Sequence, residues 1–452
     1  MLRRTLLEWD SLPHGNDPNN LRTIPEPVAA RLAAVAAASN LAGRGETGVL
    51  EHGRHALRAR NVVGVIAAEG CTLEILPKID VNDEGDAGTA AIRRRLVDML
   101  AVALDLRIDV GAITELAWQR ETMLDILIRV FAEQLAEAVR QGMPRHYVRQ
   151  EDDLRVLRGS LDTVRQCTRH AVNPTRLACR FDDLSADIAL NRIMKAAVTR
   201  LSGVARSHAN RRRLQDLMFA YADIAAVPVN ALRWDQVVLD RTNSRWETLL
   251  TLAKLLLSDR FQTTTGGPGA GLSLLFDMNA LFEDYVGRLV RRALVGTGMT
   301  VALQGGGLFC LTDEKTERGL FQTRPDILIR KGGRVVHIID TKWKRIAADV
   351  SDPKRGVSQA DVYQMMAYGR LYGTPHLTLL FPHHAGLPEP SGLEVVHRIG
   401  TDPAWLRAAT LDVSNGTGIL DRLRGLASWE VKEGTIPTPT PRRPRPGAAW
   451  SA

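Results

Sequence analysis

One short segment restricts the fold of this chain more than any other: two apolar runs joined by a glycine turn, with acidic residues at the open end. Asp326 opens the first run, and the second run ends in an acid-x-lysine triplet formed by Asp340 and Lys342. Because successive residues of a strand face opposite sides, Asp340 and Lys342 share one face with Ile338. The segment is therefore predicted to be a β-hairpin that gathers charged groups at one end.

The loop between the two runs decides whether Asp326 joins that face. A two-residue turn at 332–333 would place Asp326 on the opposite face, because a one-residue slip reverses every side chain. A three-residue loop at 331–333, with a glycine in the left-handed conformation, pairs Asp326 with Ile338 and places it diagonal to Asp340. Their Cβ atoms would then lie roughly 6–8 Å apart, a gap that one cation can bridge. We therefore predict the three-residue loop.

This arrangement resembles the PD-(D/E)xK nuclease motif. The resemblance implies that Asp326 and Asp340 hold Mg²⁺, with Mn²⁺ as a substitute, since these cations prefer oxygen ligands. The backbone carbonyl of Thr341 would complete the coordination, and Lys342 would stabilise the attacked phosphate or orient the attacking water. The alternative is an apolar hairpin with acids at its strand ends and no chemistry.

A helix is expected after the hairpin, over residues 358–368. Gln364 and Tyr368 are four residues apart and share one helix face, while Met365 and Met366 belong to a more apolar face. We expect the helix to pack beside the hairpin and to direct Gln364 and Tyr368 at a phosphate or a metal-bound water. This spacing resembles the RecB-like branch of these nucleases. The alternative is an amphipathic helix with two polar residues at its edge.

A further helix is expected upstream of the hairpin, from a cap at Asp277 to Leu294. Glu283 lies at the edge of its apolar stripe, whereas Asp284 lies on the far side. Glu283 is therefore a candidate for an additional catalytic, metal-facing carboxylate. A glutamate exposed to solvent is the alternative.

Composition limits the partners and the compartment. A net charge of +8 and a sequence pI near 9.5 favour a polyanionic partner such as DNA. The four cysteines are widely spaced without a C-x-x-C pair, so zinc ribbons and disulfide frameworks are not expected. No run reaches membrane-spanning length and no secretory signal is visible, which predicts a cytoplasmic protein without membrane contact. The sequence lacks a G-x-x-x-x-G-K-[ST] motif, so we do not expect the chain itself to hydrolyse nucleotides.

The 452 residues predict a multidomain α+β or α/β protein. The expected parts are an N-terminal mixed β/helical region that engages a partner (1–142), a mostly helical middle block (143–262), a C-terminal PD-(D/E)xK restriction-endonuclease-like α/β domain (263–435) and a disordered proline/arginine tail (436–452). Residues 263–271 are expected to form a flexible connection into the nuclease domain.

The order of motifs along the chain resembles the McrC family, the nuclease subunit of McrBC-type, modification-dependent restriction systems that serve in defence. Thr341 is a departure, because family members often have alanine after the second acid. The runs that carry the resemblance are 63–66, 73–79, 157–161, 190–193, 277–283, the acid/acid-x-lysine hairpin and 363–368.

The resemblance implies an endonuclease that docks through its non-nuclease half on an McrB-like AAA+ GTPase hexamer. It further implies that the chain stimulates GTP hydrolysis and cuts both strands of modified double-stranded DNA. Two alternatives remain: a stand-alone RecB-like nuclease, and a non-catalytic activator of an NTPase ring. The long region before the nuclease domain argues against the first, and the intact set of Asp326, Asp340 and Lys342 argues against the second.

Overall fold

The computed structural model describes most of the chain. The described residues are 2–17, 19–39, 41, 48–78, 86–106, 108, 111, 113–172, 175–241, 243–258, 261–264, 271–346, 354, 356–387, 394–400, 404–414, 416 and 418–428. The tail expected at 436–452 lies outside them, as does most of the connection expected at 263–271. Within the described residues, no helix is both long enough and apolar enough to cross a membrane.

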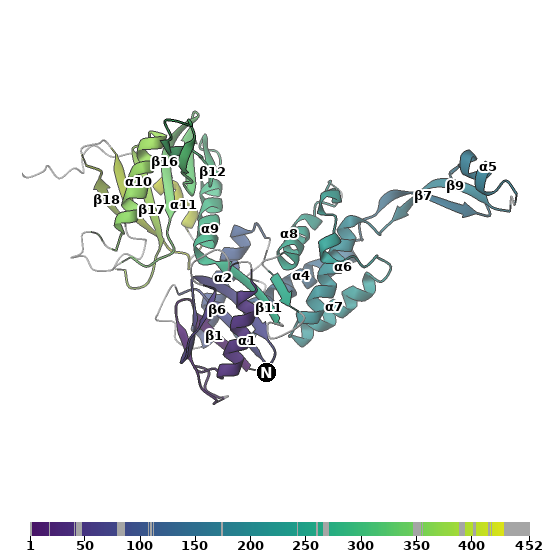
Figure 1. Cartoon of the computed structure of the whole chain (residues 1–452), viewed down its shortest axis with the longest axis horizontal. Coiled ribbons are helices and arrows are strands. Elements are labelled where there is room, and N and C mark those ends of the chain that lie inside the picture. Colours follow the sequence, from purple (N-terminus) through teal and green to yellow (C-terminus); the bar gives the residue numbers. More distant parts are fainter. Residues whose placement is uncertain are drawn as a thin grey trace, which may run out of the picture.

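The N-terminal region is built on a five-stranded sheet with helices on both faces (Figure 1). Helix α1 (Glu26–Ala37) packs on one face, and α2 (Asp86–Ala103) and α4 (Met123–Arg140) cover the other. Strand β5 is buried along its whole length because both faces are covered. The strand order is β1 (Leu2–Leu7), β6 (Cys71–Leu76), β5 (Val62–Ala68), β11 (Gly271–Asp277) and β10 (Phe261–Thr264). A small sheet beside it contains β2 (Ser11–Pro13), β4 (Ala56–Ala59) and β3 (Leu50–His52).

Two strands of this sheet come from the part of the sequence assigned to the nuclease domain. Strand β11 pairs antiparallel with β5, and β10 pairs with β11. Gly64 allows the close approach of β11, because a Cβ at this position would lie 2.0 Å from the carbonyl oxygen of Leu274. The chain therefore returns to the N-terminal sheet before it enters the C-terminal domain, whose first helix, α9, starts directly after Asp277.

A buried ion pair joins the N-terminal sheet to its helices. Glu74 on β6 is fully buried and accepts two hydrogen bonds from Arg93 on α2, at 2.8 and 2.6 Å. It also accepts the backbone N–H of Met123 at the start of α4, at 2.8 Å. Both carboxylate oxygens are thus satisfied, which such a buried charge requires. One of the runs that resemble the McrC family has this structural role.

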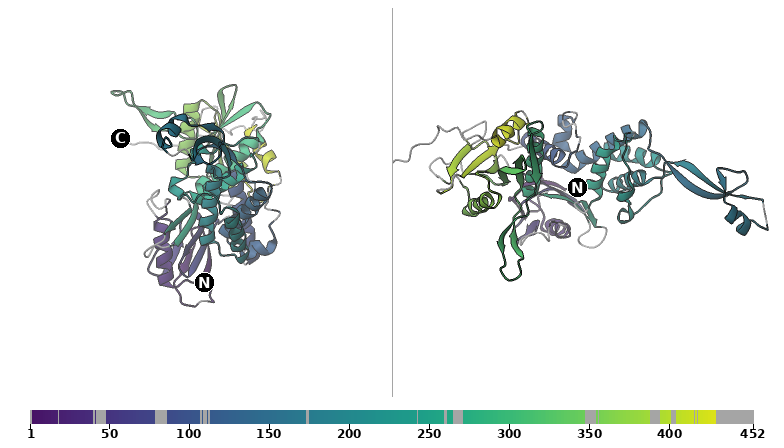
Figure 2. Two further views of the ribbon diagram at one scale, coloured as in Figure 1. Left: turned by 90° about the vertical axis from the view of Figure 1, so that its right-hand side faces the viewer. Right: turned by 90° about the horizontal axis from the view of Figure 1, so that it is seen from above.

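The middle block contains the expected helices and also a long β-ribbon that was not expected. Strands β7 (His146–Leu154) and β9 (Leu177–Ser185) pair antiparallel and project far from the body of the molecule (Figures 1 and 2). Charged residues on both faces of these strands hide the two-residue alternation that marks a half-buried strand. The ribbon also carries β8 (Ser160–Leu161) and α5 (Thr163–Arg169). The helices of this block are α6 (Ala189–Val204), α7 (His208–Ala220) and α8 (Trp246–Leu257), whereas the short α3 (Glu115–Arg120) packs on α2 in the N-terminal region.

The C-terminal domain is a six-stranded mixed sheet between helices. Helices α9 (Met278–Ala293) and α11 (Ile419–Ala427) cover one face, and α10 (Gln359–Tyr372) covers the other. The strand order is β12 (Met299–Leu303), β15 (Ile327–Lys331), β16 (Arg334–Thr341), β17 (His376–Pro382), β19 (Trp405–Leu411) and β18 (Glu394–Arg398), with β16, β17 and β19 parallel. A separate hairpin, β13 (Phe309–Thr312) and β14 (Gly319–Gln322), lies between β12 and β15 in the chain.

All four cysteines are free, in agreement with the expectation of no disulfide framework. Cys71 and Cys179 are buried, while Cys167 and Cys310 are exposed.

Candidate active site

The turn of the β15–β16 hairpin differs from the three-residue loop that we predicted. Lys331 pairs with Arg334, which leaves a two-residue turn. Gly332 and Gly333 have φ angles of 58° and 83°, so both central residues are left-handed. Tight hairpins favour this geometry because its twist matches that of the strands, and two consecutive glycines permit it without strain. The prediction of an odd loop was therefore wrong.

A β-bulge restores the register that the two-residue turn would have reversed. Arg330 pairs with Val335, but the next pair is Ile329 with His337, so Val336 is an extra residue on β16. The pairing continues to the end of the strand with this offset. A bulge depends on the twist of the whole sheet, and the local sequence pattern does not reveal it.

The corrected register brings the two acids level with each other. Ile327 pairs with Ile339, and one further step places Asp326 opposite Asp340. The two residues therefore share a face, as predicted, but they lie directly across from each other rather than diagonally. Residues directly opposite have Cβ atoms about 4.5–5.5 Å apart, closer than the diagonal spacing that we expected.

Asp340 lies at the centre of the polar cluster. Its side chain is 1% exposed, and its Oδ2 lies 2.6 Å from Nζ of Lys342. Its Oδ1 accepts a hydrogen bond from Nε2 of Gln364 at 3.4 Å. Burial raises the pKa of the Asp340 carboxyl, and the neighbouring charge of Asp326 raises it further. A second positive charge at this place would lower that pKa and stabilise the ionised form.

Thr341, which lies between Asp340 and Lys342 in the chain, holds the Asp326 carboxylate in place. Its Oδ2 accepts the backbone N–H of Thr341 at 2.7 Å and the hydroxyl of Thr341 at 2.8 Å. Burial raises the pKa of Asp326, and the charge of Glu283 adds to this effect. Thr341 thus supplies a side-chain hydrogen bond that alanine at this position would lack.

The helix α10 brings Gln364 and Tyr368 to the hairpin. Nζ of Lys342 donates to Oε1 of Gln364 at 3.3 Å, and Nε2 of Gln364 donates to the hydroxyl of Tyr368 at 2.8 Å. Burial lowers the pKa of Lys342, but the Asp340 carboxylate outweighs this effect, so the pKa is raised and the lysine is protonated. The Ser358 hydroxyl caps α10 by accepting from the backbone N–H of Asp361 at 3.2 Å.

Glu283 lies at the edge of the cluster, on α9. Burial raises its pKa, a hydrogen bond with the side chain of Gln304 lowers it, and the charge of Asp340 raises it again. Gln304 has a left-handed backbone (φ 47°), and its N–H donates to the carbonyl of Asp326 at 2.8 Å. Gln304 thus connects Glu283 with Asp326, a role that no motif spacing reveals.

Asp361 is another acid near the site that the sequence did not single out. It forms an ion pair with Lys344. Burial raises its pKa, but hydrogen bonds from Lys344 and Ser358 outweigh this effect, so the pKa is lowered. Its charge acts on both Asp340 and Lys342. A visible signal was its position three residues before Gln364 on the same expected helix.

The donor set fits an oxygen-preferring cation with several water ligands. Among the described residues, no three His, Cys, Asp or Glu side chains already surround one point in the way a closed metal site would. Asp326 and Asp340 offer two carboxylates, and Thr341, which contacts Asp326, directly follows Asp340 in the chain. Mg²⁺ commonly binds one or two carboxylates and keeps several waters. Burial and the neighbouring carboxylates raise the pKa of Asp326 and Asp340, and a bound cation would offset this effect.

Residues 57–382 match the family model described as "McrBC 5-methylcytosine restriction system component". No curated protein gives a significant match.

Two solved structures share the fold. One is a half-complex from a tetradecameric assembly of Thermococcus gammatolerans McrB AAA+ hexamers with bound McrC; it is 21% identical with a TM-score of 0.68, over 93% of this chain and 98% of the other. The second is the cryo-EM structure of the Thermococcus gammatolerans McrBC complex, which is 24% identical with a TM-score of 0.51, over 65% of this chain and 88% of the other.

Proposed function

The chain belongs to the McrBC 5-methylcytosine restriction system component family, and we propose that it is the Mg²⁺-dependent endonuclease subunit of such a system. The observation that most supports this proposal is the convergence of a buried carboxylate, Asp340, a half-buried one, Asp326, and a protonated lysine at the end of the β15–β16 hairpin. A hairpin without chemistry would not need two facing acids that are largely withdrawn from water, because such charges are costly to desolvate.

The residues of the cluster divide the work of phosphodiester hydrolysis. Asp326 and Asp340 would hold the cation, with the carbonyl of Thr341 as a third ligand. When bound, Mg²⁺ polarises the phosphate and lowers the pKa of a coordinated water. Lys342 remains protonated and lies beside Asp340, where it would stabilise the negative charge on the attacked phosphate.

The polar residues of α10 orient these groups. Gln364 contacts both Asp340 and Lys342, so it keeps the lysine close to the carboxylate. Burial raises the pKa of Tyr368, which keeps its hydroxyl neutral. That hydroxyl accepts from Gln364, and its own proton would be donated to a phosphate oxygen or a water.

We further propose that the chain docks on an AAA+ GTPase hexamer through the β7–β9 ribbon. The first of the similar structures contains McrB AAA+ hexamers with bound McrC and matches nearly the whole chain. The ribbon projects from the body of the molecule (Figure 1). It exposes several apolar side chains. Exposed apolar groups of this kind mark interaction surfaces. They include Tyr147, Val156, Leu157, Val164 and Val172.

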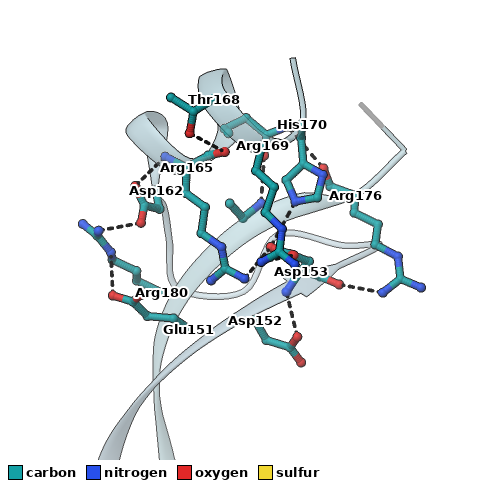
Figure 3. A network of polar contacts seen from close by, with 12 residues as sticks. Glu151, Asp152, Asp153, Asp162, Arg165, Thr168, Arg169, His170, Arg176 and Arg180 are labelled. Carbon is teal, nitrogen blue, oxygen red and sulfur yellow. Dashed lines mark hydrogen bonds and ion pairs between the residues drawn. The ribbon is translucent and has the colours of Figure 1, made fainter. Parts of the chain in front are cut away.

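A charged network gives the tip of the ribbon a defined shape (Figure 3). Asp153 of β7 lies 3.0 Å from a guanidinium nitrogen of Arg165 and 3.1 Å from Nε2 of His170. Arg165 belongs to α5 and His170 is its C-terminal cap, so Asp153 fastens this helix to the ribbon. A rigid tip loses less conformational entropy on binding than a mobile one would.

The decisive experiment compares the chain alone with the chain plus the protein encoded beside it. Plasmids with and without 5-methylcytosine are incubated with GTP and with Mg²⁺, Mn²⁺ or a chelator. We expect cleavage only with the neighbouring protein, GTP and a divalent cation, and preferentially on the methylated plasmid. Cleavage by the chain alone would favour a stand-alone nuclease, and stimulated GTP hydrolysis without any cleavage would favour a non-catalytic activator.

A further inference from the structure

A contact between the first strand of the chain and the candidate active site connects two parts far apart in sequence. Trp343 directly follows Lys342, and its indole N–H donates to Oε1 of Glu8 at 2.6 Å. Glu8 follows β1 in the N-terminal region, 335 positions away. Glu8 is 2% exposed and Trp343 is 9% exposed, so solvent does not replace this hydrogen bond.

Glu8 is firmly attached to the N-terminal sheet. Its backbone N–H donates to the carbonyl of Leu76 at the end of β6, at 2.9 Å. Its Oε1 also accepts the backbone N–H of Lys78 at 2.9 Å. The carboxyl group is therefore a fixed point of the sheet, and Trp343 is attached to it.

Trp343 is in turn packed against the nuclease core. Its ring lies 5.2 Å from the ring of Phe282 on α9, at an interplanar angle of 58°. Phe282 precedes Glu283, the acid at the edge of the candidate site. Trp343 therefore contacts both the N-terminal sheet and α9 from the position next to Lys342.

The segment around Trp343 has room to move if this attachment is lost. A cavity of about 230 Å³ lies beside it, lined among others by Glu8, Lys78, Trp343 and His384. The second carboxyl oxygen of Glu8, Oε2, is buried without a hydrogen-bond partner. A buried acid with one unsatisfied oxygen costs stability, and a function in positioning explains why this position carries one.

The two residues before Trp343, Thr341 and Lys342, form backbone hydrogen bonds that position the proposed catalytic groups. The N–H of Thr341 donates to Asp326 at 2.7 Å, and the N–H of Lys342 donates to the carbonyl of Leu380 at 2.9 Å. A shift of Trp343 would be transmitted to both hydrogen bonds, since they lie one and two residues away.

We propose that Glu8 is a positioning residue that holds the Thr341–Lys342 backbone in catalytic geometry through its hydrogen bond to Trp343. The nuclease site is then complete only when the N-terminal sheet is seated against it. This inference rests on the proposed endonuclease function and adds a link between that site and the N-terminal region.

The test uses the full-length chain, four single variants and the Glu8→Ala/Trp343→Phe double variant. Glu8→Ala removes the acceptor, Trp343→Phe removes the donor but keeps a ring against Phe282, and Glu8→Gln keeps an acceptor oxygen without the charge. Asp10→Asn is the matched control, because Asp10 pairs with Lys78 at 2.6 Å at the exposed side of the same region. The measurements are amide hydrogen exchange of residues 340–346 and the kcat and KM of DNA cleavage with the partner and Mg²⁺.

We expect amide exchange of this segment to rise about tenfold in Trp343→Phe, which loses one buried hydrogen bond, and at least as much in Glu8→Ala, which also loses the acceptor of the Lys78 N–H. The kcat of cleavage should fall by a similar factor with KM unchanged. The Glu8→Ala/Trp343→Phe double variant should be no worse than Glu8→Ala, because both single changes remove the Glu8–Trp343 contact. Glu8→Gln and Asp10→Asn should behave like the wild type.

Two results would separate failure of this inference from failure of the proposed function. Unchanged exchange and kcat in Trp343→Phe, in a protein that cuts DNA, would overturn the positioning role alone, as would a Glu8→Gln variant as defective as Glu8→Ala. If exchange responds as expected but the wild type cuts no DNA with its partner, the proposed function is overturned and the attachment of the segment stands.

Discussion

Lys342 contacts two acceptors at once, Oδ2 of Asp340 at 2.6 Å and Oε1 of Gln364 at 3.3 Å. Its place on the same face as Asp340 follows from strand alternation, so this part of the site could be predicted from the sequence. The hydrogen bonds of Gln304 and the buried acid Glu8 could not, because their partners come from distant segments. Only the tertiary fold brings these groups together.

The contacts of Lys342 predict that arginine cannot replace it. A guanidinium is a broad, rigid fork, whereas an ammonium is a compact charge that fits between two acceptors. We expect Lys342→Arg to lose roughly 10²-fold or more of cleavage activity, nearly as much as Lys342→Ala. DNA binding should persist, because we expect other basic residues of this chain of net charge +8 to contact the phosphate backbone. Parallel cleavage and gel-shift assays measure both effects. An active arginine variant would mean that Lys342 acts only through its positive charge and not through a specific contact.

Glu8 predicts a pH dependence of stability. Burial raises its pKa from 4.5 to about 7, so between these pH values the folded state holds a proton that the unfolded chain has released. The free energy of unfolding therefore falls as pH rises through this range, by up to about 3 kcal/mol. Glutamine resembles the protonated acid.

We thus expect Glu8→Gln to match the wild type near pH 5 and to exceed it in stability at pH 8. Denaturant unfolding at both pH values measures the difference. A stability difference that does not change between these pH values would contradict the raised pKa.

At the scale of the element, the β15–β16 hairpin shows what a pattern can and cannot predict. The shared face of the two acids was predicted correctly, but through the wrong loop. The two-residue turn and the extra residue Val336 together give the register that a three-residue loop would also give. Both solutions satisfy the alternation of apolar residues, so the sequence pattern does not distinguish them.

This register can be tested by moving one residue. Deleting Val336 should turn the following residues of β16 to the opposite face of the sheet, so that Asp340 no longer faces the same side as Asp326. We expect this variant to lose cleavage and much of its thermal stability. Inserting one glycine into the turn of the same variant restores the count between Ile329 and His337. We expect this second change to recover metal-dependent cleavage. Equal activity of the two variants would contradict the proposed role of the bulge.

The network at the ribbon tip predicts a separable effect. Asp153→Ala should release α5 from the ribbon, because it removes the partner of Arg165 and His170. We expect a higher concentration of this variant to be needed for half-maximal stimulation of the partner's GTP hydrolysis. Its thermal unfolding should stay close to that of the wild type, because the tip contributes nothing to the main core. Unaltered stimulation would exclude the tip as a docking element.

At the scale of the whole molecule, the chain order does not match the spatial order. Strand β11 follows the middle block in sequence but completes the N-terminal sheet, and α9 starts directly after it. The sequence predicted the β15–β16 hairpin and helices α9 and α10, since their periodicity is local, but it missed the β7–β9 ribbon. It could not predict the pairing of β5 with β11, because that pairing depends on a close approach of distant backbones at Gly64. The C-terminal domain is therefore attached to the N-terminal sheet without a long linker.

The central claim is that the Asp326–Asp340 pair cuts DNA while the rest of the chain engages a GTPase partner. The most direct test is Asp340→Ala, measured in parallel for plasmid cleavage with Mg²⁺ and for stimulation of GTP hydrolysis. We expect a loss of cleavage of roughly 10²-fold or more with stimulation unchanged, because the change removes one of the two proposed carboxylate ligands from β16, far from the ribbon (Figure 1). Cleavage at the wild-type rate would contradict the central claim.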